Sequence, residues 1–383
     1  MALTAGGISS SDLVDLMRTT LPALPSDFEV AQQNQTNEIV NNWFNPGERE
    51  EYPAGTGIVK NIMLDSSGNA QHVRMFQQRS INVADVQSRF TMPWCMVTFY
   101  WAVERNELVR ARKPAAFINL LSSRQTDAEL STANLLQLRG WLGPESSSDD
   151  LNPYGVPFWI NKIPPSTATG YSSTIDAPSP YGGFVGRRII YGQTSTPTYV
   201  LTNKAGINPT SNALFRNYAG VYTAMDAQCI KFMRDLFHAV RFKSPRIVKD
   251  LVEGPLSKYR IYMNRPTLVG YEDLATKMND NIGPDLAPYQ DATSFKRVPI
   301  EYANQLDQDN AQVNSSWGCD PIYFINHSKF RACVLEGQWF YRYEPMSDVT
   351  MPGTIVTWHE GTYQYECTNV REGGGVLHKA LTN

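Results

Sequence analysis

The chain has 383 residues, of which 42% are hydrophobic and 19% charged, and its formal net charge is -3. This length can form more than one globular unit, and the small negative charge argues against attraction of the whole molecule to nucleic acid. No apolar run approaches the roughly 18 residues of a membrane span, and the first residues lack the basic and apolar stretches of a secretory signal. Five scattered cysteines without a C-x-x-C pair predict reduced, mostly buried thiols.

The N-terminal segment predicts a short helix over residues 10–23. Leu13, Leu16 and Met17 would form its small apolar face, and a serine can cap its start. The residues that follow, through Asn45, are polar, rich in Asn and Gln, and without a clear period. This composition predicts an arm that lies on another surface rather than a domain with its own core.

A β-hairpin is predicted over residues 56–76, with a turn at Asp65–Asn69 between two arms that mix apolar and polar residues. A projecting hairpin with apolar side chains usually needs a partner surface. The aromatic run at 93–104 then predicts a strand that leads into a long helix.

That helix is predicted over residues 114–142. Pro114 suits a first helical turn, and Gly143 follows the last apolar residue, where helices commonly end. Apolar residues recur every seven positions, at Leu121, Ala128, Leu135 and Leu142, and indicate one apolar stripe. About 29 residues would span roughly 43 Å, far beyond the mean helix of about 11–12 residues. Such a rod suggests the backbone of a flat, elongated subunit, and the helix alone equally allows a long packed helix in an ordinary enzyme.

The region 144–209 holds nine of the 24 prolines, so it predicts a long ordered loop with little regular structure. Its aromatic residues Tyr154, Phe158 and Trp159 indicate that it packs down. Regular structure resumes after Asn212. The spacing predicts helices near 224–241 and 271–280 and strands at Tyr259–Met263, Arg297–Tyr302, Pro321–Asn326, Cys333–Tyr341 and Thr354–Val370.

Motifs for catalysis or cofactor binding are not evident. The glycine-rich runs at 181–186 and 373–375 lack the strand–glycine–helix context of a phosphate loop. The five histidines are far apart, and no G-x-S-x-G elbow is present. Glu104 and Glu107 stand beside several basic residues and predict a salt-bridge cluster rather than acid–base chemistry. We therefore predict no catalytic residues, no metal site and no cofactor.

The order of these elements is arm, projecting hairpin, long helix, proline-rich loop and mixed α/β unit. This order resembles the Hong Kong 97 type of tailed-phage major capsid protein. Short runs carry the resemblance along nearly the whole chain: EIVNNWF (38–44), VKNIMLD (59–65), GNAQHV (68–73), the segment 86–94, ERNE (104–107) with the pairs 120–121 and 141–142, SSSDD (146–150), NPYGVPFW (152–159), the pair 217–218, RVP (297–299), DPIYFIN (320–326) and CTN (367–369).

The resemblance implies an α+β capsid fold with an N-terminal arm, an extended β-hairpin loop, a long spine helix in a peripheral domain, and an axial domain. The implied boundaries are 1–50 for the arm, 51–112 for the extended loop, 113–210 for the peripheral domain, 211–342 for the axial domain, and 343–383 for a C-terminal strand returning to the peripheral domain. The implied function is that of a non-enzymatic major capsid protein that self-assembles into the icosahedral head shell enclosing the DNA genome of a tailed bacteriophage.

The resemblance also implies partners and a location. Copies of the chain would form pentamers and hexamers in the virion capsid after assembly in the bacterial host cytoplasm. We expect a separate scaffolding protein, because only about 45 residues precede the extended loop, together with a portal and an optional decoration protein. Packaged DNA would be touched only through non-specific contact, and no membrane is implied. Lys60 lies in the extended loop without a recognisable Asn and Glu partner, so no covalent cross-linking is expected.

Contacts between subunits would bury the arm and the hairpin. The candidates are the apolar residues Ile58, Ile62 and Leu64 of the hairpin and Leu16 and Met17 of the N-terminal helix. Replacement of Ile62 and Leu64 by Asp is expected to block assembly and to leave a soluble, folded subunit. Two other functions stay open from the sequence: another virion structural protein, such as a tail or decoration protein, and a cytoplasmic hydrolase.

Overall fold

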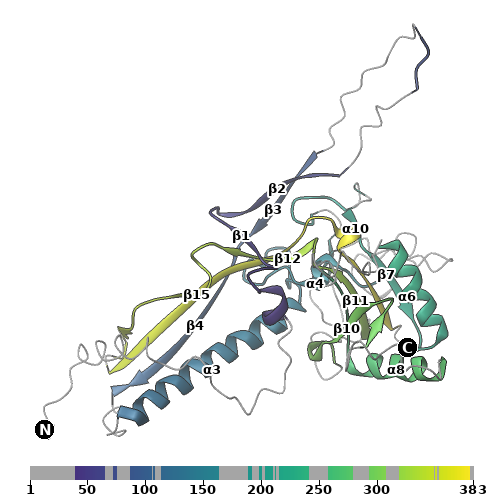
Figure 1. Ribbon diagram of the computed structural model, residues 1–383. Helices are drawn as coiled ribbons and strands as arrows, with labels where there is room; N and C mark the ends of the chain where they lie inside the picture. Colours follow the sequence, from purple (N-terminus) through teal and green to yellow (C-terminus); the bar gives the residue numbers. More distant parts are fainter. Residues whose placement is uncertain are drawn as a thin grey trace, which may run out of the picture.

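The computed structural model describes residues 39–64, 72–75, 87–105, 107, 114–163, 189–191, 198–200, 203–209, 212, 215–240, 258–278, 293–307, 319–348, 350–351 and 353–379. The predicted N-terminal helix, with Leu16 and Met17, and the glycine-rich run at 181–186 lie outside these residues. Figure 1 shows an elongated subunit. A long helix and two long strands form one end, a second sheet with two helices forms the other, and a two-stranded hairpin projects between them.

The first sheet has six strands built around the longest one, β15 (Thr354–Cys367). One edge of β15 pairs antiparallel with β4 (Cys95–Glu104), from Thr354 opposite Glu104 to Tyr363 opposite Cys95. Three strands pair antiparallel with the other edge of β15, one after another along its length: β14 (Met346–Ser347), β13 (Tyr341–Arg342) and β12 (Phe330–Leu335). The sixth strand, β1 (Glu50–Tyr52), pairs parallel with β12. The predicted strands at 93–104 and 354–370 are confirmed, although the second ends at Cys367.

The long helix is confirmed as α3 (Pro114–Gly140), which packs against β4. Its 27 residues would span roughly 40 Å. Arg124 ties it to the sheet by donating to the carbonyl oxygen of Ala102 in β4. Near its C-terminal end the short helix η2 (Ile39–Trp43) packs against α3. There the backbone N–H of Ile39 donates to the buried Gln137 Oε1 (3.0 Å).

The predicted apolar stripe of α3 is only partly correct. Leu121, Ala128 and Leu142, which lies just past the end of the helix, are buried, but Leu135 is exposed. After Ala128 the buried positions advance in steps of four, to Thr132, Leu136 and Gly140. Steps of four follow the i±4 ridge of a helix, which winds around the axis, whereas a seven-residue spacing stays near one line. Near its C-terminal end the buried side of the helix therefore departs from a straight heptad stripe.

The second sheet has the strand order β7-β16-β11-β8-β10-β9. Its strands are β7 (Tyr218–Tyr222), β8 (Tyr259–Met263), β9 (Ser294–Phe295), β10 (Val298–Tyr302), β11 (Cys319–Asn326) and β16 (Gly374–Lys379). The β7–β16 and β8–β10 pairs are parallel, and the other pairs are antiparallel. The predicted strands at 259–263, 297–302 and 321–326 are confirmed within two residues. The predicted strand at 333–341 is displaced: β12 runs from Phe330 and ends at Leu335.

Both faces of this sheet are covered. Alternate residues of a strand point to opposite sides, so each strand contributes side chains to two hydrophobic cores. Ile261, Met263, Ile322 and Phe324 face the core that includes the buried residues of α6 (Ala227–Ala239). Tyr262, Tyr323 and Ile325 face the larger core, which continues through Trp43 and Trp141 to the first sheet. The two sheets thus share one continuous hydrophobic core.

Two helices border the second sheet. Helix α6 confirms the prediction at 224–241, and it begins where the Asp226 side chain accepts from the backbone N–H of Cys229 (2.9 Å). Helix α8 (Arg265–Met278) begins six residues before the predicted start. Asn264 accepts from the backbone N–H of Thr267 (3.2 Å) and Pro266 sits in the first turn, so cap and proline signals were present in the sequence but overlooked.

The hairpin differs from the prediction. Strand β2 (Gly57–Met63) pairs with β3 (Gln87–Pro93), not with residues 70–76, so the connection is much longer than the predicted turn. Met92 lies opposite Ile58, and Phe90 lies two residues before Met92 on the same face; all three side chains are buried. This shared apolar face explains the choice of partner strand.

The proline-rich region packs as predicted where it is described. Phe158 and Trp159, in the short helix α4 (Val156–Trp159), are fully buried, and Tyr154 packs against the same core. The indole N–H of Trp159 donates to the carbonyl of Tyr365 in β15 (3.1 Å). Further along, β5 (Ile189–Tyr191) pairs antiparallel with β6 (Thr198–Val200).

Strand pairing crosses the boundaries implied by the resemblance. Strand β4, assigned to the extended loop (51–112), belongs to the first sheet beside α3, and so does β12, assigned to the axial segment (211–342). The last strand, β16, pairs with β7 and β11 in the second sheet, whereas β15, which precedes it in the sequence, belongs to the first sheet. The turn at α10 (Val370–Gly373) explains this change of sheet. Domain limits read along the chain therefore do not coincide with the sheets.

Candidate assembly interface

The described residues offer little for catalysis or metal binding. Within these parts of the chain, no three His, Cys, Asp or Glu side chains could hold one metal ion, and no helix there is long and apolar enough to cross a membrane. All five cysteines are free, and every one except Cys319 is buried, which confirms the predicted thiols. The glycines at 373–375 pack without space for side chains: a Cβ on Gly374 would collide with the Phe324 carbonyl and Ile160.

Glu107, one of the two acidic residues just before α3, forms an ion pair with Arg124 of the helix. Glu107 Oε1 lies 2.6 Å from a guanidinium nitrogen of Arg124. The other carboxylate oxygen of Glu107 accepts from the backbone N–H of Glu104 (3.3 Å). The prediction of a salt bridge at this junction is confirmed, and one of its cations, Arg124, comes from inside the helix, one turn after Leu120.

A charged network holds the base of the hairpin to the first sheet. Lys60 of β2 lies between Glu366 of β15 (2.7 Å) and Glu50 of β1 (3.0 Å). Tyr52 donates its hydroxyl to the second oxygen of Glu366 (2.9 Å), and Arg331 of β12 approaches Glu50 (3.3 Å). Four strands therefore meet in one polar cluster, which fixes the hairpin relative to the sheet.

The network is strongly asymmetric in exposure. The Glu366 side chain is only 1% exposed, and burial raises its pKa although the Lys60 charge opposes the shift. For Glu50 burial also favours a higher pKa, but the hydrogen bond from Lys60 and the nearby charges of Lys60 and Arg331 outweigh it, so the pKa is lowered. Burial favours a lower pKa for Lys60, and the charge of Glu366 outweighs that effect and raises it. Lys60 is thus an ammonium held by two carboxylates.

The structure places the predicted hairpin contact residues inside the subunit. Ile58 and Leu64 are buried and Ile62 is partly buried, all against the subunit's own core. The exposed face of the hairpin carries Val59 and Met63 instead. In this conformation a neighbouring subunit would meet the outer face of the hairpin. The assignment of Ile58, Ile62 and Leu64 as contacts stays a prediction, and Ile62 and Leu64 are accessible where they line the cavity described below.

An exposed apolar face lies on the first sheet. Trp358 is directly opposite Tyr100, with ring centroids 4.7 Å apart. Residues two apart on a strand, or directly opposite on neighbouring strands, share a face. Five large exposed residues share this one: Met96, Tyr100, Tyr341, Met346 and Trp358. We call them the sheet-face patch.

The sheet-face patch was not predicted. The sequence of strand 95–104 contained a signal for it. Met96 and Tyr100 lie on the face opposite to the buried Val97 and Trp101, and the solvent-facing side of such a strand is usually polar. Exposed apolar side chains gathered on one face mark interaction sites, and Met, Tyr and Trp are enriched in protein interfaces.

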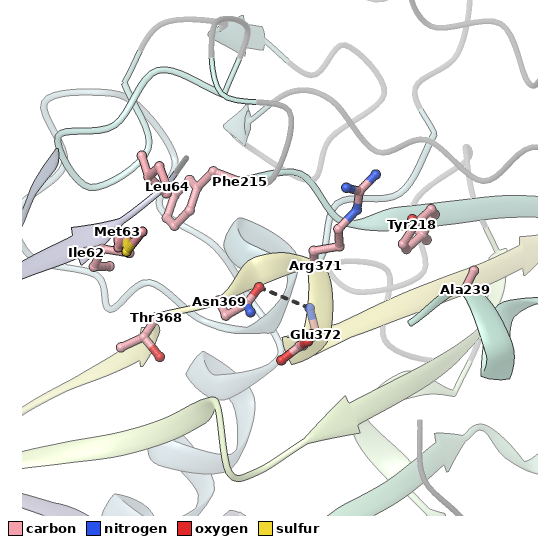
Figure 2. Close-up of a pocket in the computed structure, with 10 residues that line it drawn as sticks. All are labelled: Ile62, Met63, Leu64, Phe215, Tyr218, Ala239, Thr368, Asn369, Arg371 and Glu372. Carbon is pink, nitrogen blue, oxygen red and sulfur yellow. Dashed lines mark hydrogen bonds between the residues drawn. The ribbon is translucent and has the colours of Figure 1, made fainter. Parts of the chain in front are cut away.

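A cavity of about 360 Å³ lies between the hairpin and the second sheet. Figure 2 shows Leu64 beside Phe215 on one side, Tyr218 and Ala239 on the other, and Arg371 between them. The Arg371 guanidinium lies over the Tyr218 ring, 5.3 Å from its centroid. The backbone N–H of Glu372 donates to Asn369 Oδ1 (3.3 Å), which fixes the turn of α10 below the cavity.

Comparison with solved structures identifies the fold. A chain of the capsid asymmetric unit of cyanophage A-1(L) is 13% identical, with 96% of this chain and 99% of that chain covered at a TM-score of 0.55. The capsid of Myoviridae phage XM1 gives 10% identity, coverage of 98% and 100%, and a TM-score of 0.50. No family model and no curated protein sequence matches the chain. The chain therefore has a mixed α+β fold like that of these phage capsid proteins over nearly its full length.

Proposed function

We propose that this chain is the major capsid protein of a tailed bacteriophage, which assembles in many copies into the icosahedral shell around the DNA genome. The observation that carries the proposal is the fold likeness over 96–98% of the chain to subunits of two phage capsids. The likeness also covers 99% and 100% of those two chains, so it extends over the whole fold rather than over one part of it.

The geometry supports a structural role. The subunit is elongated, with a hairpin projecting from one side (Figure 1) and an apolar patch on one sheet. Different surfaces of one chain that bind each other make heterologous contacts, which close into rings when the rotation permits. Many weak contacts shared among copies can give a stable shell. A non-enzymatic function agrees with the same picture.

Within this proposal, α3 is the spine of the peripheral domain, and the second sheet with α6 and α8 forms the axial domain around capsomer axes. The length of α3 and its packing along β4 support the first assignment. The separate core on the helix-covered face of the second sheet supports the other. Strand β15, which pairs with strands from four other parts of the chain, would connect the two domains.

The proposal extends to partners and location. Copies of the chain would form pentamers and hexamers, assemble in the bacterial cytoplasm with a separate scaffolding protein and a portal, and become part of the virion. A decoration protein would be an additional partner, and contact with packaged DNA would be non-specific.

Expression of the full chain, alone and together with candidate scaffolding proteins from the same genome, tests the proposal. Electron microscopy and sedimentation should show shells, pentamers or hexamers. A stable monomer under all of these conditions would contradict the capsid function. Closed shells from the chain alone would contradict only the need for a separate scaffold.

A further inference from the structure

We infer that the free edge of strand β4 (Cys95–Glu104) joins two copies of this chain, which pair edge to edge as antiparallel strands around a two-fold axis. Among the described strands, β4 pairs only with β15, so its second edge has no partner strand there. The inference deepens the proposed function, on which it rests, because it names one contact between capsid subunits.

The contacts of β15 show which backbone groups of β4 point out of this edge. Trp358 lies opposite Tyr100, and the carbonyl of Trp358 accepts from the backbone N–H of Tyr343 (2.9 Å), next to β13 on the other edge of β15. In an antiparallel ladder, opposite residues either exchange hydrogen bonds or both direct their backbone groups away from each other. The backbone groups of Tyr100 therefore point out of the free edge. Because the direction alternates along a strand, those of Thr98 and Met96 do so too.

The C-terminal end of this edge is closed beside α3. Arg124 donates to the carbonyl of Ala102, and the backbone N–H of Glu104 donates to Glu107 Oε2 (3.3 Å). In the parts of the chain that the structure describes, no hydrogen bond reaches the outward backbone groups of the three earlier residues. Backbone groups that are excluded from water are almost always paired. The open groups therefore face solvent, and the side chains of the same three residues are exposed beside them.

Nothing in the sequence of the strand protects this edge. Residues 96–102 (MVTFYWA) contain no charge, proline or glycine, and the pairing of β4 with β15 is continuous without a bulge. Natural proteins usually shield an edge strand with a charged side chain, a proline or a bulge, because an open apolar edge pairs with other strands. The edge is therefore suited to an added strand, and it overlaps the sheet-face patch at Met96 and Tyr100.

A second copy of the same strand fits this edge. A two-fold axis centred on Phe99 would place Tyr100 opposite the partner's Thr98 and Met96 opposite the partner's Ala102, so each large side chain meets a smaller one. Aromatic and β-branched residues in opposite positions stabilise a sheet, and no charge within residues 96–102 opposes the contact. Rings such as pentamers and hexamers use heterologous contacts, whereas this contact is isologous and closes at two copies. It would therefore join neighbouring rings.

Cysteine cross-linking of the full-length chain tests the pairing. A chain with Thr98→Cys mixed with a chain with Tyr100→Cys should form a disulfide under mild oxidation at a yield at least fivefold above the control mixture, Thr98→Cys with Met346→Cys. The control is matched, because Met346 is also an exposed residue of the sheet-face patch, but β14 pairs with the other edge of β15. Equal yields would overturn the inference, and high yields in both mixtures would indicate a face-to-face contact instead.

Substitutions at the centre of the edge add an independent reading. Thr98→Lys and Thr98→Pro should each lower the yield of closed shells at least tenfold and leave pentamers and hexamers, whereas Thr98→Val should keep the wild-type yield. Because the N–H of Thr98 points outward, proline removes no hydrogen bond of the subunit's own sheet, and melting temperatures check that each variant is folded. Normal shells from both blocking variants would overturn the inference and leave the capsid function intact. Cross-linked pairs from a chain that never forms rings or shells would support the pairing and contradict the capsid function.

Discussion

Lys60 Nζ in the hairpin lies 2.7 Å from Glu366 Oε1 in β15, and this pair joins the projecting element to the central strand of the first sheet. The carboxylate is almost fully buried, whereas the lysine is one-quarter exposed. A buried charge without its partner costs far more free energy than the pair contributes. The direction of the hairpin is therefore tied to the retention of this one contact.

Lys60→Met is expected to lower the free energy of unfolding by about 2–3 kcal/mol near pH 7. This loss is slightly smaller than the loss on breaking a fully buried ion pair, because Lys60 is partly exposed. Glu366 would keep its hydrogen bond from Tyr52 but lose its cation. Urea unfolding of dispersed subunits measures the effect. Lys231→Met, at an exposed position of α6, is the matched control and should change stability by less than about 0.5 kcal/mol.

The pH dependence of this deficit follows from Glu366. Its pKa in the folded chain is raised by burial, and loss of Lys60 raises it further. A carboxyl whose folded pKa exceeds its unfolded value adds stability below the unfolded pKa and loses it as pH rises. The Lys60→Met deficit should therefore be larger at pH 7 than at pH 5, and a second change, Glu366→Gln, should recover part of it. A deficit independent of pH would contradict this account.

The local elements of this fold were predictable, and the contacts between distant segments were not. Helix α3 and strand β8 followed from proline, glycine and apolar spacing. The β2–β3 pairing was missed because the nearby Asp65–Asn69 sequence favours a tight turn, whereas the partner with matching buried residues comes more than 20 positions later. Nothing local identifies Glu366 as buried, since its environment is made by β1, β2 and β12.

The outer face of the hairpin should carry its contact with a neighbour. Val59→Asp with Met63→Asp is expected to reduce shell yield at least tenfold while the subunit stays folded, because these side chains are 46% and 67% exposed. Ile62→Asp with Leu64→Asp, chosen from sequence alone, should instead destabilise the subunit, since Leu64 is buried in the core. Particle counts by electron microscopy and melting temperatures separate the two effects. Normal shells from the Val59 and Met63 variant would contradict this contact.

The sheet-face patch is expected to bind another copy of the chain in the shell. Tyr100→Ser with Trp358→Ser should reduce assembly strongly and change the melting temperature little, because both side chains are exposed and their rings contact each other. Val269→Ser, an exposed apolar position on α8, serves as the control. Sedimentation of assembly mixtures gives the fraction in particles. An unchanged fraction would exclude the patch from the subunit contacts.

Lys60 should not form a covalent bond to a neighbouring chain. An amine must be neutral to attack a carbonyl, whereas two carboxylates hold Lys60 in its charged form and raise its pKa. Boiled particles are expected to give a single band near 43.0 kDa on a denaturing gel. A ladder of higher bands that persists in wild type and disappears in Lys60→Arg would contradict the expectation.

His378 should make the second sheet sensitive to acid. Burial, helped by the charge of Lys162, lowers its pKa to about 3, and its Nε2 accepts from the backbone N–H of Ile163 (3.0 Å). The unfolded chain takes up this proton near the ordinary histidine pKa, so the stability contributed by neutral His378 falls as pH drops from about 6.5 to about 3, by at most about 1.4 kcal/mol per pH unit.

Replacement of His378 by Gln tests this mechanism, because the amide offers an acceptor oxygen but does not titrate. Wild type should be the more stable form at pH 7, and its advantage should shrink steadily between pH 6.5 and pH 4 in urea unfolding of dispersed subunits. A constant difference between wild type and His378→Gln would show that His378 binds its proton equally well in the folded and unfolded chain, contrary to its burial between β11 and β7.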